Sequence, residues 1–522
     1  MSADTDDLAP DWWKSAVVYQ VYPRTFADGD GDGVGDLAGI RAHLDHLERL
    51  GVDVVWLSPV YRSPMDDNGY DISDYQDVDP IFGSLAELDG LIADLHARGI
   101  KLLMDLVVNH TSSAHAWFQE SRSSTDNPKR DWYWWRPSPP NDWTSFFSGP
   151  AWTQDDATGE YYLHLFADSQ PDLNWENPDV RRAVHEMMRW WLDRGVDGFR
   201  MDVVNLLSKP SLDRPHAEVF NGPRIHEFLQ EMHREVFAGR GPGLLTVGET
   251  PECGLDDARL YTDPSRGEVD MVFQFEHVDL DSGPGGKWDV VPMTLLDLKR
   301  SWGRWQEGLA DVGWNSLYLG NHDQPRSVSR FGDDSPEHRV ASAKALATVL
   351  HLHRGTPYVY QGDELAMTNA PLAAVGDLRD IESLNAYAGM LARGVEPDDA
   401  MTAIRAKSRD HARTPVPWDE AAAQWDDPDS VAHHYRRLVA LRHDHPVVAH
   451  GDFEMLLPEH EQVYALTRRL DGVTLLVVAN LSSDDAVADL DGERLELAPW
   501  EARVTLDGDP VLAAEGLGDA RT

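Results

Sequence analysis

Three carboxylates each close a short apolar run, and carboxyl groups are the side chains that glycosidic-bond cleavage needs. Asp202 lies in GFRMDVV, Glu249 in GLLTVGET and Asp323 in NSLYLGNHD. In this chemistry one carboxyl group protonates the leaving oxygen, and another attacks or stabilises the anomeric carbon. The three segments are far apart in the sequence, so the fold must bring them together. An α/β barrel does so, because its parallel strands all end on one face.

Apolar runs of strand length alternate with longer segments of helical period. Helical patterns include residues 37–51, which open after Asp36 and stop at Gly51, a plausible cap at each end. Near-continuous apolar runs are typical of strands buried on both faces of a parallel sheet. Such runs occur at residues 17–23, 53–60, 101–108, 198–204, 243–250, 271–277, 315–323 and 356–364. Eight strand–helix units predict an α/β fold, a (β/α)₈ TIM barrel.

The spacing of the runs also predicts the domain organisation. We assign residues 1–108 and 178–447 to the barrel. Residues 109–177, which are rich in Trp and turn residues, separate the third and fourth strands and predict an inserted subdomain that walls the active-site face. Residues 367–430 form a second insertion after the eighth strand, and residues 448–522 carry short strands and Asp-Gly turns typical of a C-terminal all-β sandwich.

Charge and composition exclude several classes of partner. The net charge of −44 argues against binding to nucleic acid or to an anionic membrane surface. The acidity is typical of a solvated surface, and it also fits adaptation to high salt. No run of about 18 apolar residues occurs, and MSADTDDLAP lacks the basic and apolar segments of a secretory signal, so we expect a cytoplasmic protein without a membrane span. The single cysteine, Cys253, allows no intrachain disulfide.

Five motifs give a family resemblance. They are DLVVNH (105–110), QPDLN (170–174), GFRMD (198–202), VGE (247–249) and NHD (321–323). With these motifs in this order, the sequence from Trp13 to about residue 505 resembles the α-amylase superfamily of glycoside hydrolases (family 13), and within it the oligo-1,6-glucosidase and α-glucosidase branch. The resemblance implies a barrel, an inserted subdomain, a C-terminal β-sandwich and retaining hydrolysis of α-glucosides.

The resemblance also implies a role for each carboxylate. Asp202 would be the nucleophile, Glu249 the general acid/base and Asp323 the group that stabilises the transition state. Arg200 lies two residues before Asp202 and so points to the same side of the strand, where its charge would hold Asp202 ionised. Glu249 must stay protonated until it donates, so its pKa should be raised.

A pocket closing over one terminal glucose is implied as well. The resemblance places its contacts at Asp67, Tyr70, His110, Phe147, Phe166, Gln170, His322 and Arg413. For Phe147 and Phe166, packing inside the inserted subdomain is the alternative. Val203 follows the nucleophile, and Val at this position looks like the type that prefers α-1,6 bonds. Its stiff, β-branched side chain would narrow the entrance just beyond the cleaved bond.

The loop FADGDGDGVGDL predicts a cation site. Its candidate ligands alternate through a Gly-rich segment: Asp28, Asp30, Asp32, the carbonyl of Val34, and Asp36. Oxygen ligands at every second residue suit Ca²⁺, with Mg²⁺ as the alternative. The start resembles an EF-hand, but loop position twelve is Gly39 rather than Glu. The family that the sequence resembles carries a metal at this loop, in agreement with the spacing of the carboxylates.

The sequence therefore predicts a retaining, exo-acting α-glucosidase that acts on small oligosaccharides, prefers α-1,6 bonds and is a monomer or small homo-oligomer. A maltase-type enzyme that prefers α-1,4 bonds is the first alternative. A glucosyl-transferring isomerase is the second, although QPRSVSRFGDD after the third carboxylate lacks the Arg/Asp-rich stretch of sucrose isomerases. A non-catalytic relative, like the heavy chain of amino-acid transporters, is disfavoured because the carboxylate trio is intact.

Overall fold

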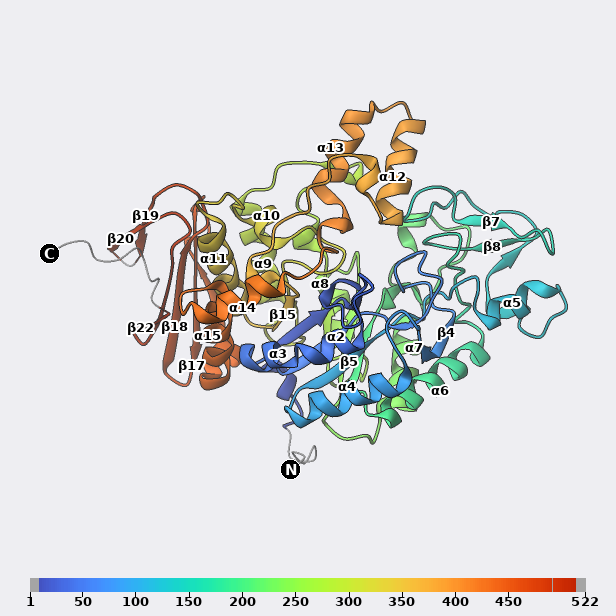
Figure 1. Cartoon of the computed structure of the whole chain (residues 1–522), viewed down its shortest axis with the longest axis horizontal. Coiled ribbons are helices and arrows are strands. Elements are labelled where there is room, and N and C mark those ends of the chain that lie inside the picture. The colour runs from blue at the N-terminus through green and yellow to red at the C-terminus, as the bar shows by residue number, and fades with distance from the viewer. Residues whose placement is uncertain (1–8, 491, 513–522) are drawn as a thin grey trace.

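The computed structural model describes residues 9–490 and 492–512. Within these residues, eight parallel strands form the central barrel (Figure 1). Their order is β11-β10-β9-β5-β2-β1-β15-β14, and a parallel bridge between Val272 and Asn315 joins the two outer strands and closes the barrel. The strands are β1 (Val18–Val21), β2 (Val54–Leu57), β5 (Lys101–Leu106), β9 (Gly198–Met201), β10 (Leu245–Glu249), β11 (Met271–Phe273), β14 (Ser316–Leu317) and β15 (Thr356–Tyr360).

The predicted (β/α)₈ barrel is confirmed, and all eight predicted strands are present. Each strand is shorter than its apolar run. The difference is largest for β14, which pairs with β15 over two residues only, so that Asp323 lies in the loop beyond the strand. Asn321 shapes this loop, because its side-chain oxygen accepts a hydrogen bond from the backbone N–H of Asp323 at 2.8 Å.

Helices cover the outside of the barrel, as amphipathic segments between parallel strands do. They are α2 (Leu37–Ala42), α3 (Leu44–Leu50), α4 (Leu85–Ala97), α6 (Pro178–Arg194), α7 (Ile225–Met232), α8 (Leu255–Thr262), α9 (Leu295–Gly308), α11 (Arg339–His351) and α15 (Val431–Asp444). Shorter helices are α1 (Pro23–Phe26), α10 (Ser327–Phe331), α14 (Trp418–Asp426) and α16 (Pro446–His450). None of the helices in the described residues is long and apolar enough to cross a membrane.

The segment 37–51 forms two helices rather than the single predicted helix. Asp36 caps the first and Gly51 ends the second in the left-handed region at φ 84°, as expected. The chain leaves helical geometry at His43, whose Nδ1 lies 2.8 Å from the carbonyl oxygen of Gly39 and whose ring packs against Trp418 with centroids 3.9 Å apart. Contact with a distant aromatic ring therefore accompanies a break that local periodicity does not show.

The chain between β5 and α6 leaves the barrel on the right of Figure 1. It holds α5 (Ala116–Ser123) and a small antiparallel sheet of β6 (Trp135–Arg136), β8 (Tyr161–Leu163) and β7 (Trp152–Gln154). Two further short hairpins lie in barrel loops: β3 (Tyr61–Arg62) with β4 (Asp74–Val78), and β12 (Ser282–Gly283) with β13 (Gly286–Val290). These segments build the walls above the barrel strands.

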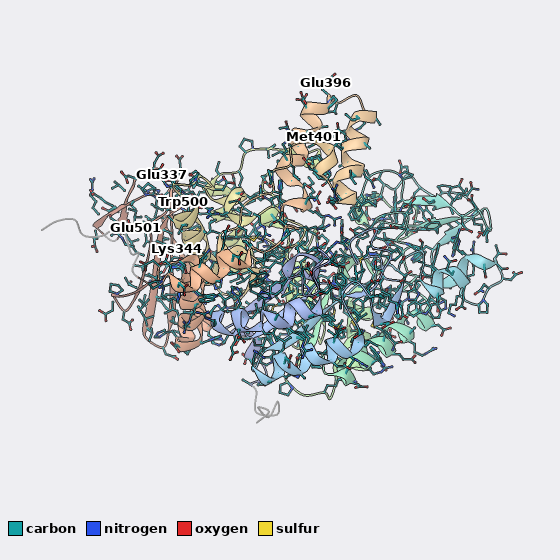
Figure 2. All side chains as sticks on the ribbon, viewed as in Figure 1. Glu337, Lys344, Glu396, Met401, Trp500 and Glu501 are labelled. Carbon is teal, nitrogen blue, oxygen red and sulfur yellow. The ribbon has the colours of Figure 1, made fainter. Side chains whose placement is uncertain are left out.

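After β15 a helical hairpin stands above the barrel, at the top of Figure 1. It consists of α12 (Ile381–Ala392) and α13 (Pro397–Lys407). Glu396 marks its outer turn and Met401 its packed interior (Figure 2). Beyond α13 the chain returns to the barrel through Arg409 and Arg413.

The C-terminal domain is antiparallel and lies to the left of the barrel in Figure 1. Its main sheet is β16 (Asp452–Leu456), β17 (Val463–Leu470), β18 (Val473–Asn480), β21 (Ala502–Leu506) and β22 (Asp509–Leu512). The pair β19 (Ala486–Leu490) and β20 (Glu493–Leu497) packs on one face of it through a small apolar core that includes Val463, Val478 and Leu497. The domain is thus a sandwich of one large and one small sheet. Residues 513–522, the last part of the predicted domain, lie outside the described residues.

Candidate active site

One buried arginine links the catalytic candidates on β9 and β10. Arg200 is 1% exposed, and its Nη1 donates to Asp202 at 2.7 Å and to Asp105 at 2.9 Å. Its Nη2 forms an ion pair with Glu249, whose other oxygen accepts a hydrogen bond from the backbone N–H of Val203 at 3.0 Å. The expected side-by-side placement of Arg200 and Asp202 is therefore present, and Glu249 joins them.

The third carboxylate, Asp323, is held from the second insertion. Its Oδ1 accepts hydrogen bonds from Arg413 at 2.7 Å and from Arg409 at 3.3 Å. Its Oδ2 lies 3.3 Å from Nε2 of His322. Arg409 also donates to Asp67 at 2.9 Å, so one guanidinium joins two carboxylates that line the pocket.

A polar cluster around Asp67 forms the inner end of the site. Gln170 comes from the inserted segment and donates from Nε2 to Asp67 at 3.1 Å, and the same nitrogen lies 3.2 Å from Nε2 of His110. His110 also contacts the carbonyl oxygen of Tyr70 at 3.2 Å. Fixed donors and acceptors of this kind suit the hydroxyl groups of a sugar.

Aromatic rings complete the wall. Phe147 and Phe166 pack edge to face with centroids 5.4 Å apart, and the Arg409 guanidinium lies 4.8 Å from the Phe147 ring. Tyr70 stacks on His322 at 5.1 Å with an interplanar angle of 7°, and its hydroxyl donates to Asp105. These rings enclose a cavity of about 220 Å³, which Asp202, Glu249 and Asp323 all line.

Burial and neighbouring charges set the protonation of the carboxyl groups. Burial raises the pKa of Glu249, as its expected role requires, although Arg200 opposes the shift. Burial and the charge of Glu249 also raise the pKa of Asp202, so Arg200 does not by itself keep Asp202 ionised as expected. Two buried carboxyl groups that share one cation titrate as a pair, and the pair retains a proton readily.

Asp323 behaves in the opposite way. Burial alone would raise its pKa, but His322, Arg409 and Arg413 together lower the pKa of Asp323 well below its usual range. Burial lowers the pKa of His110 to about 4 and that of His322 to about 3, so both imidazoles are neutral at pH 7. Asp323 is therefore an anionic carboxylate with neutral imidazoles near it, whereas Asp202 and Glu249 share a proton.

The sequence-predicted contacts divide into two groups. Residues that line the cavity are Asp67, Tyr70, His110, Phe147, Phe166 and Val203. Residues that lie behind the lining and hold it in place are Gln170, Arg200, His322 and Arg413. Phe147 and Phe166 both line the cavity, and Phe166 also packs against the apolar core of the inserted segment.

Several lining residues are absent from the sequence prediction. Arg409 is the most central, because it contacts Asp67, Asp323 and Asp380. Lys287 and Glu382 form an ion pair of 2.6 Å on the outer wall. The hairpins β12–β13 and α12–α13 bring Lys287 and Glu382 to the pocket, and Arg409 lies in the segment that follows α13. For Arg409, the sequence feature that could have indicated a role in the pocket was its position one helical turn before Arg413.

Val203 has an unusual backbone. Its φ of 35° lies in the left-handed region, which β-branched residues rarely adopt. This turn directs the Val203 N–H to Glu249 and the side chain, 8% exposed, into the cavity wall beside Leu206. Strained geometry of this kind persists where the surroundings fix it.

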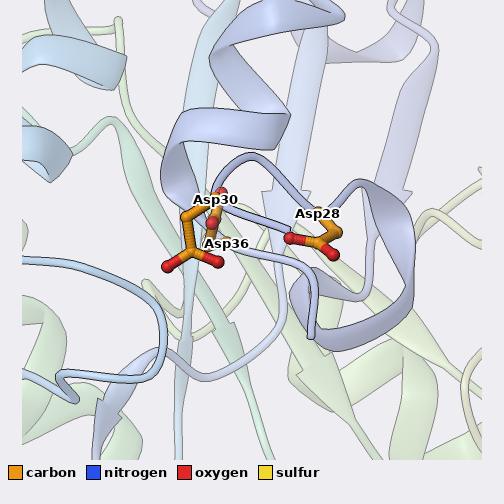
Figure 3. A group of neighbouring side chains, drawn as sticks. All are labelled: Asp28, Asp30 and Asp36. Atoms are coloured by element: carbon orange, nitrogen blue, oxygen red, sulfur yellow. The ribbon is translucent and has the colours of Figure 1, made fainter. Parts of the chain in front are cut away.

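The Asp-rich loop brings three of its four carboxylates together (Figure 3). Carboxylate oxygens of Asp28, Asp30 and Asp36 lie within 4.8 Å of one another. Asp32 lies outside this group, and its Oδ1 accepts the backbone N–H of Val34 at 2.7 Å. Backbone N–H groups of Gly33 and Gly31 lower the pKa of Asp28, which favours its ionised form.

Comparisons with known proteins agree with this geometry. Residues 20–451 match the family described as "Alpha amylase, catalytic domain". The chain is 51% identical to an oligo-1,6-glucosidase of Parageobacillus thermoglucosidasius, over 94% of this chain and 98% of that protein. It is 44% identical to a trehalose-6-phosphate hydrolase of Bacillus subtilis, over 97% and 95% of the two chains.

Solved structures lead to the same family. A trehalulose synthase superposes with a TM-score of 0.91 at 41% identity, covering 94% of this chain and 99% of the other. The family match and the high identities extend over nearly the whole described fold. The chain belongs to the α-amylase family.

Proposed function

We propose that the protein is a retaining, exo-acting α-glucosidase that releases glucose from the non-reducing end of short α-glucosides. The observation that carries this proposal is the shared contact of Asp202 and Glu249 with Arg200 at the cavity floor. A common guanidinium holds the two carboxyl groups close together. This arrangement fits the spacing of roughly 5 Å used by retaining enzymes better than the wider spacing of inverting enzymes.

In the proposed reaction the residues act in two steps. Glu249 protonates the glycosidic oxygen while an oxygen of Asp202 attacks the anomeric carbon; the bond between that carbon and the glycosidic oxygen breaks, the rest of the substrate leaves as an alcohol, and a covalent glucosyl intermediate remains. Glu249 then removes a proton from water, which displaces Asp202 and restores the α configuration. Asp323, held ionised by its arginines, stabilises the positive charge that develops on the sugar ring.

The closed inner end of the pocket supports the proposed exo action. Asp67, Arg409 and Gln170 close the cavity beyond the catalytic carboxylates through direct hydrogen bonds. A polymer cannot thread through a closed end, so the enzyme removes one terminal unit at a time. Lys287 and Glu382 lie on the outer wall, where the second sugar of a short substrate would reside.

Linkage preference is the finer part of the proposal. Relatives named oligo-1,6-glucosidase at 51% and 52% identity support α-1,6 bonds. The likeness to a trehalulose synthase favours a sucrose-isomerising enzyme as the second candidate. Glucose release from isomaltose, maltose, sucrose and trehalose, with product anomers followed by NMR, separates these activities. A β-anomeric first product, or isomerised sucrose as the main product, would overturn the proposal.

We also propose that the loop 28–36 binds a structural Ca²⁺. Carboxylate oxygens of Asp28, Asp30 and Asp36 all lie within 4.8 Å of one another, close enough for one Ca²⁺ ion with Ca–O bonds of about 2.3–2.6 Å to contact all three. Mg²⁺ is the alternative ion at this loop. The oligomeric state and the cytoplasmic location stay predictions from the sequence.

A further inference from the structure

His322 sits in a rigid frame below the cavity. Tyr70 and Tyr22 stack on its imidazole ring, with ring centroids 5.1 Å and 6.0 Å away. The Trp56 ring meets the imidazole edge on, with centroids 5.8 Å apart. The residue that reaches its inner nitrogen is Gln20 in β1, which is 1% exposed. Nε2 of Gln20 lies 2.9 Å from Nδ1 of His322 and donates to the hydroxyl of Ser58 at 3.1 Å.

The opposite nitrogen fixes which tautomer this frame holds. Nε2 of His322 lies 3.3 Å from Oδ2 of Asp323, and an ionised carboxylate can only accept a hydrogen bond. This contact is at ion-pair distance, and the negative charge of the carboxylate favours a proton on Nε2, which leaves the lone pair on Nδ1. That lone pair needs a donor, and the amide of Gln20 is the group in contact with it.

The same chain contains a second pair of this type. Nε2 of Gln274 lies 2.9 Å from Nδ1 of His277, and Nε2 of His277 lies 2.7 Å from the carbonyl oxygen of Tyr318. A carbonyl oxygen also only accepts, so His277 must carry its proton on Nε2 and Gln274 must donate. Both glutamines and both histidines are at most 2% exposed. Gln274–His277 borders a different cavity and does not line the proposed sugar pocket.

We propose that Gln20 is a positioning residue that holds His322 in the Nε2–H tautomer. In this form His322 directs its N–H to Asp323, the carboxylate that lines the sugar pocket. Gln20 itself touches neither the cavity nor the reacting atoms and acts through His322. The role for the sugar rests on the proposed glucosidase function, whereas the tautomer itself does not.

Replacement of Gln20 by Glu should reverse the preference. A carboxylate at this place accepts a hydrogen bond, so it stabilises a proton on Nδ1 and also the doubly protonated imidazolium. The other groups facing His322 are Asp323, which favours its charged form, and Arg200, Arg413 and Arg409, which oppose it. At low pH the imidazolium still donates from Nε2. As pH rises the proton on Nε2 leaves first, and the N–H that faces Asp323 is lost.

The main experiment compares Gln20→Glu with the matched control Gln274→Glu. Each places a buried carboxylate beside Nδ1 of a histidine, so both test the cost of the charge itself. We expect Gln20→Glu to lower kcat/KM for isomaltose by about tenfold or more near neutral pH, and to move the alkaline limb of its pH profile to lower pH. Gln274→Glu should keep the wild-type profile. Equal profiles in both variants would overturn the proposal.

A double-mutant cycle tests whether Gln20 acts through His322. In a His322→Asn background, Gln20→Glu should change kcat/KM by less than about twofold, since the mediating imidazole is gone. An undiminished effect in that background contradicts the proposal. If Gln20→Glu does not fold, Gln20→Leu removes the donor without adding charge. Its effect on kcat/KM should likewise shrink to less than about twofold in the His322→Asn background.

The tautomer of His322 can also be determined by NMR, without an activity measurement. In protein labelled with ¹⁵N-histidine, and with the signal assigned by its loss in His322→Asn, Nδ1 of His322 should have the shift of an unprotonated nitrogen. It should move toward the protonated value in Gln20→Glu. A protonated Nδ1 in the wild type overturns the inference. An inactive wild type with an unprotonated Nδ1 would instead refute only the proposed function.

Discussion

At the scale of single residues, charge balance decides the chemistry of the pocket. Arg200 supplies one positive charge to three buried carboxyl groups, those of Asp105, Asp202 and Glu249. Buried charges without partners are costly, so this group lowers its energy by keeping a proton. A retained proton on the Asp202–Glu249 pair is what a general acid requires, while the separate arginines of Asp323 keep that group ionised.

Removing each carboxylate tests its proposed role. Asp202→Asn, Glu249→Gln and Asp323→Asn should each lower kcat for isomaltose by several orders of magnitude, because nucleophilic and proton-transfer effects each contribute roughly 10²-fold or more. The substitutions keep side-chain volume, so circular dichroism should show a folded protein. Turnover close to that of the wild type in any variant would show that its role belongs to another residue.

The pH dependence should reflect the coupled pair. The pKa values of Asp202 and Glu249 are both raised by burial, so the alkaline limb of kcat/KM, where Glu249 loses its proton, should lie well above the ordinary titration of a glutamate. Glu249→Gln is the control, measured on an aryl α-glucoside whose leaving group needs no acid. The alkaline limb should disappear in this variant. An unchanged limb would assign it to another group.

Val203 provides the test of linkage preference. An α-1,6 bond has an extra rotatable bond, so the second sugar can swing clear of an apolar wall that an α-1,4-linked sugar would meet. We expect isomaltose to be preferred over maltose, with discrimination of about 1–3 kcal/mol, or roughly 10–200-fold in kcat/KM.

Two substitutions separate shape from polarity at this position. Thr has nearly the shape of Val and keeps the β-branch at φ 35°, so a shift toward maltose in Val203→Thr indicates that its hydroxyl pairs with the second sugar. A shift in Val203→Ala but not in Val203→Thr would indicate the width of the entrance. If the native enzyme prefers maltose, the linkage prediction is wrong.

The success of the sequence prediction at this scale has a physical basis. Asp202 and Glu249 adjoin strands whose pairing is fixed by continuous apolar runs, so strand ends could be located from the sequence. Lys287 and Glu382 reach the pocket from a loop hairpin and a helical hairpin, and Arg409 from the segment after that helical hairpin. Their positions depend on how those insertions fold back, which no local pattern specifies.

At the scale of elements, apolar runs predicted where strands lie but not where pairing stops. β14 has two paired residues because the chain after Leu317 turns toward the pocket. Similarly, the helix predicted over 37–51 is interrupted at His43, where Trp418 packs from the far side of the sequence. Periodicity reports which face is buried, whereas breaks depend on tertiary partners.

The loop 28–36 is the element whose proposed role can be tested by ligand removal. A cation that binds only the folded protein stabilises it by mass action, about 2.7 kcal/mol at a hundred times Kd. Chelation should therefore lower the Tm more than it lowers the initial rate at moderate temperature. Immediate loss of activity with an unchanged Tm would indicate a catalytic metal instead.

A matched pair of variants sharpens that test. Asp30 belongs to the three-carboxylate group and Asp32 does not, although each accepts one backbone N–H that an amide oxygen can also accept. Asp30→Asn should weaken the rise in Tm on Ca²⁺ addition, and Asp32→Asn should largely retain it. Equal loss in both variants would mean that the whole acidic loop, rather than this group, holds the ion.

At the scale of the whole molecule, the dominant property is excess negative charge. The chain has 90 acidic and 46 basic residues, and many basic groups are already paired with carboxylates. The remaining acidic side chains repel one another across the surface. This repulsion destabilises the compact state, in which the charges are held closer together than in the unfolded chain.

Salt should therefore stabilise this protein. The Debye length falls from about 10 Å at 0.1 M to about 3 Å at 1 M, which screens repulsion between exposed charges. Screening also weakens surface ion pairs, but such pairs contribute only about 0–1 kcal/mol each. We expect the Tm to rise steadily between 0.1 M and 1 M KCl.

The control replaces exposed Glu337 and Glu396 (Figure 2) by Gln, neither having an ion pair within the described residues. This variant should have a higher Tm at low salt and a smaller rise. A Tm that stays level or falls with added KCl would show that the acidic surface imposes no net cost on folding.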